Sequence, residues 1–160
     1  MNGRLSLAAS VIVTASLVIG IGAGCAGKSM SKMGSGDVVA DRQRAMKLQG
    51  ASWADIQAKA KAGNIEAIAV NAETLAMTAQ QIPALFPAGS LTEKSKAKPD
   101  VWQKWSEFEA AAKNLETEAG KLRDASRAKN EQLTQQLVKD FGRKACGTCH
   151  TPFRQPPPKS

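Results

Sequence analysis

Three residues near the carboxyl end of the chain carry the side chains best suited to covalent and metal chemistry. Cys146 and Cys149 are separated by two residues, and His150, the single histidine of the 160 residues, follows at once. On a helix these positions share one face, because residues three and four apart are neighbours there. The order C-x-x-C-H is the attachment signature of c-type haem, in which the two thiols bind the porphyrin covalently and the histidine ligates the iron. The motif therefore predicts one covalently bound haem c.

Three other functions of this motif are open alternatives. A structural zinc site normally needs four Cys or His ligands, and the chain has one further cysteine, Cys25, and no second histidine. A thioredoxin-like redox pair is expected near a β-α-β pattern, which is absent. A plain disulfide between Cys146 and Cys149 fits an exported protein. Haem attachment is favoured because the spacing, the helical phase, the amino-terminal export signal and a core poor in bulky side chains agree.

The composition indicates a globular interior that something other than side chains helps to fill. Hydrophobic residues are 42% and charged residues 22%, near globular averages, which excludes wholesale disorder and a polytopic membrane protein. Bulky aromatics are few, with 3 Trp, 4 Phe and no Tyr. The length fits one domain behind a short targeting segment, so a multidomain enzyme is not expected.

The chain is basic, with 22 Lys and Arg against 14 Asp and Glu and a formal net charge of +8. These cations are scattered among acidic residues, whereas nucleic-acid sites usually cluster them on one face, often with stacking aromatics. A nucleic-acid partner is therefore not expected. Acidic redox partner proteins are more plausible, because complementary charge raises the rate of encounter.

The amino-terminal segment predicts export. Arg4 is its single charged residue before Lys28, and the run between them is rich in Val, Ile, Ala and Leu. This run is long enough for a retained anchor as well, since about 20 apolar residues span a bilayer. Ile21-Gly22-Ala23-Gly24-Cys25 also resembles a bacterial lipoprotein signal, in which the cysteine is lipidated. We expect residues 1–25 to be an export signal, a lipoprotein signal or a membrane anchor, and the protein to be periplasmic, free or membrane-attached.

Residues 26–36 are rich in Gly, Ser and Lys and predict a flexible tether, and residues 155–160 predict a disordered tail. Between them, apolar positions recur at intervals of three and four, which is typical of helices. Helices are expected at about 37–62, 65–82, 101–122 and 130–153, with Asn64 capping the second and Asp100 with Gln103 forming a capping box on the third. Pro83 to Pro99 predict a long crossing loop. The expected fold of residues 37–154 is all-α, an antiparallel four-helix bundle with covalently bound haem near the C-terminus.

Each expected helix has an inward seam of mostly apolar residues. The seams are Val39, Arg42, Met46, Gln49, Trp53, Ile56 and Ala60; Ile65, Ile68, Ala72, Leu75, Ala79 and Ile82; Val101, Trp105, Phe108, Ala112, Leu115, Ala119 and Leu122; and Leu133, Leu137, Phe141 and Ala145. Arg42 is the one charged residue in these seams. A cation that faces an apolar core is costly, so either that helix end is open to water or a carboxylate meets the guanidinium.

Several segments resemble the class II c-type cytochromes, the cytochrome c' family. The segments are Arg42-Gln43 with Met46-Lys47, Ile82-Pro83-Ala84-Leu85-Phe86-Pro87, Lys98-Pro99-Asp100-Val101-Trp102, and the C-x-x-C-H motif. The resemblance covers about residues 38–154. A motif near the carboxyl end is diagnostic of this class, because class I cytochromes carry it near the amino end.

The resemblance implies a role for each site residue. It implies that His150 is the proximal iron ligand, that the first helix supplies the distal side, and that Arg42 lies near a haem propionate, which would answer the electrostatic question. The alternative for Arg42 is a surface residue whose stem lies along apolar neighbours. The resemblance also implies an electron-transfer protein and not an enzyme, and members of the class often dimerise through their first two helices.

The distal ligand decides the mechanism. With one histidine, the ligands that remain are Met, Lys, water or none. Met46 lies four residues after Arg42 on the same helical face and is favoured, whereas Met77 lies beside the second seam and is expected to pack there. Ligation by Met46 suits electron transfer, because a thioether raises the reduction potential. The alternative is a five-coordinate cytochrome that binds nitric oxide or carbon monoxide, with Met46 as a hydrophobic filler.

Trp102 and Trp105 lie three apart beside the third seam. We expect them to pack against the crossing loop or to form a dimer contact.

Overall fold

The computed structural model describes residues 36–156. The expected export signal, the lipidation site at Cys25, nearly all of the tether and residues 157–160 lie outside the described residues. Within the described part, no helix is long and apolar enough to cross a membrane.

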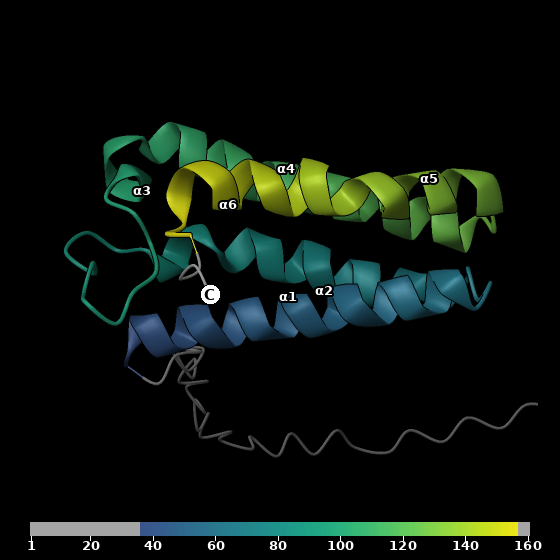
Figure 1. Cartoon of the computed structure of the whole chain (residues 1–160), viewed down its shortest axis with the longest axis horizontal. Coiled ribbons are helices and arrows are strands. Elements are labelled where there is room, and N and C mark those ends of the chain that lie inside the picture. Colours follow the sequence, from purple (N-terminus) through teal and green to yellow (C-terminus); the bar gives the residue numbers. More distant parts are fainter. Residues whose placement is uncertain (1–35, 157–160) are drawn as a thin grey trace, which may run out of the picture. The chain divides into compact units, whose positions relative to one another are not determined.

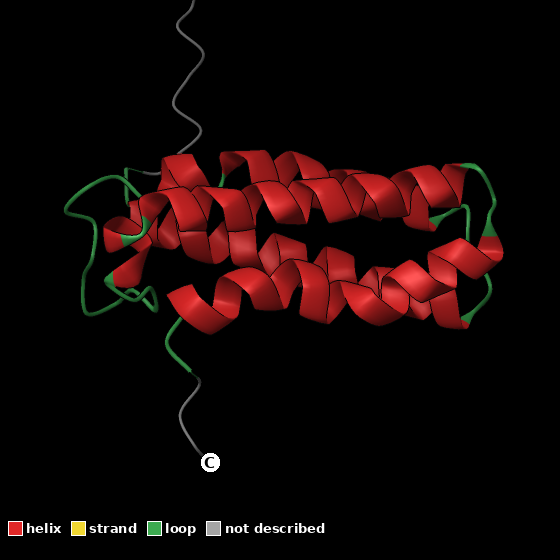
Figure 2. Ribbon diagram, turned by 90° about the horizontal axis from the view of Figure 1, so that it is seen from above, coloured by secondary structure: helices red, strands yellow, loops and turns green. Residues whose placement is uncertain are grey.

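Four long helical runs form the fold of residues 36–156. They are α1 (Val38–Lys61), α2 (Ile68–Gln81), α4 (Trp105–Arg127), and a last run made of α5 (Glu131–Phe141), a π-helical segment η2 (Gly142–Gly147) and α6 (Thr148–Phe153). Two short elements, the 3₁₀ turn η1 (Pro83–Leu85) and α3 (Asp100–Gln103), flank the crossing loop. Figure 1 and Figure 2 show the four runs side by side, and α2 packs against both α1 and α4. The predicted four-helix bundle is confirmed.

The two ends of the bundle differ. Figure 1 shows short turns at one end, between α1 and α2 and between α4 and α5, and the long loop with α3 at the other end. The carboxyl end of α6 lies at the loop end, where an isolated antiparallel bridge joins Ala97 to Arg154. The backbone nitrogen of Gln155, the first residue of the expected tail, donates to the carbonyl of Lys96 at 2.8 Å. The crossing loop is thereby tied to the end of the last helix.

The second and third predicted seams form the core. Every member is buried except Trp105, which is half-buried. In the first seam the residues at both ends are buried, including Arg42, but Met46, Gln49 and Trp53 are only half-buried. The side chains in the middle of α1 are therefore less deeply buried than those in the rest of the core.

The prediction for the start of the fourth seam is wrong. Leu133 is 46% exposed, whereas the side chain of its neighbour Thr134 is fully buried. Steps of four residues overrun the 3.6-residue turn, so a row of such steps drifts around the helix away from the core. Thr134 instead keeps a spacing of seven residues to the buried Phe141.

Two predicted helix caps are also wrong. The second helix begins at Ile68 without a side-chain cap, because Gly63, with φ of +73°, closes α1 and residues 64–67 form turns in which Ile65 is already buried. The third helix is split at Lys104, and Pro99 takes the position before Asp100, so no capping box forms. The first helix is capped by Asp37, whose carboxylate accepts from the backbone nitrogens of the second and third residues after it.

Candidate functional site

Cys146, Cys149 and His150 lie together at one cavity. Cys146 belongs to η2, and the other two residues lie on the first turn of α6. All three line a cavity of about 550 Å³ enclosed between α1, α2, α4 and the last helical run. The two cysteines are free thiols and not a disulfide, and both are half-buried.

The raised pKa values of the two thiols argue against a redox-active cysteine pair. Burial raises the pKa of Cys149 to about 11, with a smaller contribution from Cys146, whose own pKa is also raised by burial. Redox-active cysteines instead have lowered pKa values. The His150 residue is exposed, yet surrounding protein atoms desolvate its ring enough to lower its pKa, and Arg154 adds to that effect. A neutral imidazole is the form that ligates metals.

The opposite wall of the cavity comes from α1. Met46 lines the cavity together with the C-x-x-C-H residues, and Trp53 lies two turns further along the same helix. Met77 does not line it and is 57% exposed on α2. The structure therefore brings Met46 and not Met77 to the cavity that contains the motif.

Arg42 is a buried residue of the cavity wall, 5% exposed, which rules out the surface alternative. Its Nε donates to the carbonyl of Leu85 at 2.5 Å, Nη1 donates to the carbonyl of Ser90 at 3.0 Å and to Ser95 Oγ at 3.4 Å, and Nη2 donates to Ser90 Oγ. The guanidinium also lies 4.2 Å from the ring centroid of Phe86. Burial lowers the pKa of Arg42, and Asp37 opposes this shift.

In the structure, carbonyl and hydroxyl groups of the crossing loop meet the seam-facing guanidinium. The expectation that water or a carboxylate also meets it stays a prediction. Neutral acceptors satisfy the N–H groups of a buried cation without neutralising its charge. Arg42 is thus both a part of the cavity wall and an anchor for the loop.

Sequence reasoning missed several residues of the site. Lys96 and Arg154 line the cavity at the bridge between the loop and the last helix. Ser90 and Ser95 hold Arg42 from a loop that has no periodic pattern to reveal them. In the sequence, the only signal for cations near the site was the excess of basic over acidic residues.

The cavity fits a haem. Its volume lies within the roughly 300–1,000 Å³ of cofactor and ligand pockets. Its walls are largely apolar, and they include Val39, Leu75, Ile82, Phe108 and Leu115. Its reactive groups are two thiols and one imidazole, the set that a c-type haem uses. The described residues contain no group of three or more His, Cys, Asp or Glu side chains placed to hold a metal ion, so they offer no four-ligand zinc site.

A four-helix bundle with a C-x-x-C-H peptide on its last run and an apolar cavity in front of it defines a c-type cytochrome of the four-helix class. The model of one protein family, described as cytochrome c', matches residues 37–154. The chain belongs to the cytochrome c' family. The family binds one covalent haem c, and Cys146 and Cys149 fit the attachment.

Relatives include cytochromes with several spectroscopic names. Cytochrome c-556 of Agrobacterium fabrum is 33% identical over 119 residues, which cover 72% of this chain and 80% of that protein. Cytochrome c' of Pararhodospirillum photometricum is 32% identical, with 71% of this chain and 93% of that protein covered. Cytochrome c-554 of Cereibacter sphaeroides is 37% identical over 76 residues, 46% of this chain and 48% of that protein, so the chain spans about half the length of this relative.

Solved structures have the same fold. The crystal structure of cytochrome c' from Rubrivivax gelatinosus matches with a TM-score of 0.65 at 25% identity, over 75% of this chain and 96% of that one. A nitric oxide complex of a variant of cytochrome c prime from Alcaligenes xylosoxidans matches with a TM-score of 0.67 at 22% identity, over 76% and 96% of the two chains. Another cytochrome c' matches with a TM-score of 0.67 at 21% identity, over 74% of this chain and 95% of that one. It is described as having ligand-controlled dimer dissociation.

Proposed function

We propose that this chain is an exported monohaem electron carrier in which His150 and Met46 are the two axial ligands of the haem iron. The observation that carries the proposal is that Met46 lines the same cavity as Cys146, Cys149 and His150. The family is one of electron-transfer haemoproteins, and relatives within it carry the names cytochrome c-554 and c-556 as well as cytochrome c'. This supports an electron-carrying role for the chain rather than an enzymatic one.

The haem supplies reversible one-electron chemistry when it is bound. The chain's own residues set the conditions for it. The apolar walls exclude water, which favours the reduced, less charged form of the iron. A thioether from Met46 would raise the reduction potential further, and ligation by His150 and Met46 would keep the surroundings of the iron similar in both oxidation states. Arg42, at the cavity wall, is proposed to lie near a haem propionate and to form a charge-assisted bond with it.

The edge of the cavity suits an acidic redox partner. Lys47, Lys96 and Arg154 all line the cavity and are exposed, so three cations lie where the cavity wall meets solvent. Complementary charge at such an edge accelerates encounter with an acidic protein. Electron transfer through this edge is therefore expected to slow as ionic strength rises, because salt screens exposed charges.

The family supports proposals for the location and the assembly of the protein. Members of the cytochrome c' family are periplasmic, and residues 1–25 carry the expected export signal, so we place this protein in the periplasm, free or attached through its amino terminus. Homodimers are proposed to form through α1 and α2, where Leu48, Val70 and Met77 are exposed apolar residues. A related cytochrome c' is described as a dimer whose dissociation is ligand-controlled.

Absorption spectra with and without carbon monoxide test the axial ligands. The holoprotein is produced with haem-attachment machinery, and the reduced protein is then exposed to the gas. Ligation by Met46 predicts a low-spin spectrum that the gas leaves unchanged. Met46→Ala is expected to give a high-spin spectrum and to bind carbon monoxide readily, while the matched control Met77→Ala keeps the native spectrum with and without the gas, because Met77 does not line the cavity.

The second candidate function is a five-coordinate cytochrome that binds nitric oxide or carbon monoxide. The nitric oxide complex of a structural neighbour with the same fold supports considering it. Ready complex formation by the native protein would favour this function and reject Met46 as a ligand. An unchanged spectrum in Met46→Ala would also reject Met46 as a ligand.

A further inference from the structure

The peptide that carries the motif is wound irregularly. η2 (Gly142–Gly147) is π-helical, contains Cys146, and passes into the α-helical spacing of α6 at Thr148. A π turn pairs each carbonyl with the amide five residues on, whereas an α turn uses the amide four residues on. Because each residue has one N–H, the change of spacing leaves a carbonyl without an amide partner. Such a carbonyl needs another donor.

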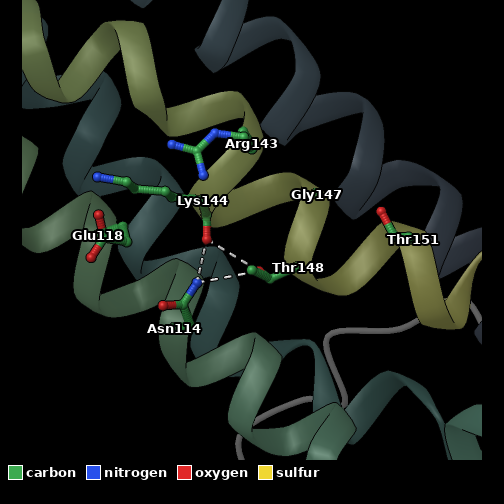
Figure 3. Close-up of a pocket in the computed structure, with 7 residues that line it drawn as sticks. All are labelled: Asn114, Glu118, Arg143, Lys144, Gly147, Thr148 and Thr151. Carbon is green, nitrogen blue, oxygen red and sulfur yellow. Dashed lines mark hydrogen bonds between the residues drawn. The ribbon is translucent and has the colours of Figure 1, made fainter.

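Side chains supply that donor at this place (Figure 3). Asn114, on α4, donates through Nδ2 to the carbonyl of Lys144 at 2.6 Å and to Thr148 Oγ1 at 3.2 Å. Thr148 Oγ1 also lies 3.2 Å from the carbonyl of Lys144 and 2.9 Å from the carbonyl of Ala145. These four groups form a small network on the side of η2 that faces α4.

We propose that Asn114 is a positioning residue for haem attachment: with Thr148, it holds the widened turn η2 against α4 and so fixes the direction in which Cys146, Cys149 and His150 face the cavity. The inference rests on the proposed placement of haem at these three residues, but not on the identity of the distal ligand.

The geometry indicates that Asn114 positions η2 rather than mainly stabilising the fold. Asn114 is half-exposed and Thr148 is exposed, so water can satisfy the carbonyl of Lys144 if the amide is removed. Water cannot hold the carbonyl at a fixed distance from α4. Thr148 is one of the two residues between the cysteines, so the network reaches into the motif itself. Movement of η2 would therefore turn the imidazole plane of His150, which sets how the ligand interacts with the iron.

Asn114→Leu in the full-length holoprotein tests the proposal, with Gln80→Leu as the matched control. Gln80 also makes an amide contact between helices, from Nε2 to Glu116 Oε1 at 2.9 Å, but on α2. Three measurements are compared: hydrogen exchange of the amides in residues 142–150, the electron paramagnetic resonance g values of the ferric protein, and the reduction potential. Asn114→Asp, an isostere that cannot donate to the Lys144 carbonyl, is the second variant.

We expect both Asn114 variants to exchange about three- to ten-fold faster in residues 142–150, as the loss of one hydrogen bond implies, and to show shifted g values and a shifted potential. Gln80→Leu is expected to change none of the three. Native g values and potential in both Asn114 variants would overturn the proposal, even if their stability fell. The mass of the proteolytic haem peptide is measured as well, because a haem bound elsewhere than at Cys146 and Cys149 would overturn the placement itself.

Discussion

The ring of Trp53 on α1 stacks on the ring of Phe141 at the end of α5, with centroids 4.9 Å apart and planes 23° from parallel. Trp53 lines the cavity, and Phe141 is 2% exposed and is followed directly by η2. This pair joins the helix that carries Met46 to the helical run that carries the motif. The width of the cavity between these two walls therefore depends on it.

Phe141→Ala is expected to lower the free energy of unfolding by about 3–5 kcal/mol, because it removes a buried ring and leaves a cavity. Denaturant unfolding of the holoprotein measures this change. Leu133→Ala on the same helix is the control, since Leu133 is 46% exposed and should cost far less. Equal losses in the two variants would contradict the importance of the stacked pair.

Periodicity predicted the fold where apolar seams are regular and long. The seams from Ile68 to Ile82 and from Val101 to Leu122 are buried almost throughout, because burial of one helix face is what a 3.6-residue pattern reports. The periodic pattern gave the wrong core residue at Leu133 and Thr134, where the threonine is buried and the leucine is exposed. Hydropathy assigns the larger apolar residue to the core, but the rotation of the helix is set by packing along its whole length.

The sequence predicted some residues of the cavity wall but not the backbone that positions them. Arg42, Met46 and the C-x-x-C-H residues all line one cavity, as their helical phases indicated, while their roles as ligands stay predictions. The π-helical form of η2 has no sequence signature, because it depends on donors such as Asn114 that are about 30 residues away along the chain. The acceptors of Arg42 likewise come from an aperiodic loop.

Arg42→Lys is expected to loosen the crossing loop. A lysine has a single charged nitrogen and cannot reach the carbonyls of Leu85 and Ser90 and the hydroxyl of Ser95 as the guanidinium fork does. We expect a loss of about 1–3 kcal/mol in the free energy of unfolding and faster limited proteolysis within residues 86–98. Arg127→Lys, an exposed ion-pair variant, is the control, and equal proteolysis of the two would contradict the anchoring role of Arg42.

Asp140 predicts a pH dependence of stability. Hydrogen bonds from Lys144 and Gln136, with a smaller contribution from Arg143, lower its pKa from 3.8 to about 2. A lowered pKa in the folded state stabilises the protein above the unfolded-state value, and this contribution disappears as the pH falls from about 4 to about 2. The difference in denaturation midpoint between native protein and Asp140→Asn should therefore shrink across this window. Parallel curves from pH 6 to pH 2 would show that Asp140 does not contribute in this way.

Thr134→Val is expected to stabilise the protein. The side chain of Thr134 is fully buried on α5, and its Oγ1 has no hydrogen-bond partner among the described residues. An unsatisfied buried hydroxyl costs roughly 1–3 kcal/mol, and valine replaces it with a methyl group of similar shape, so we expect a gain of about 1 kcal/mol in the free energy of unfolding. The matched control is Thr78→Val, which removes a hydroxyl that donates to the carbonyl of Thr74 at 2.7 Å and accepts from Gln49 at 3.3 Å. That variant should lose stability. A loss in Thr134→Val as large as in the control would mean that a bound water satisfies the buried hydroxyl.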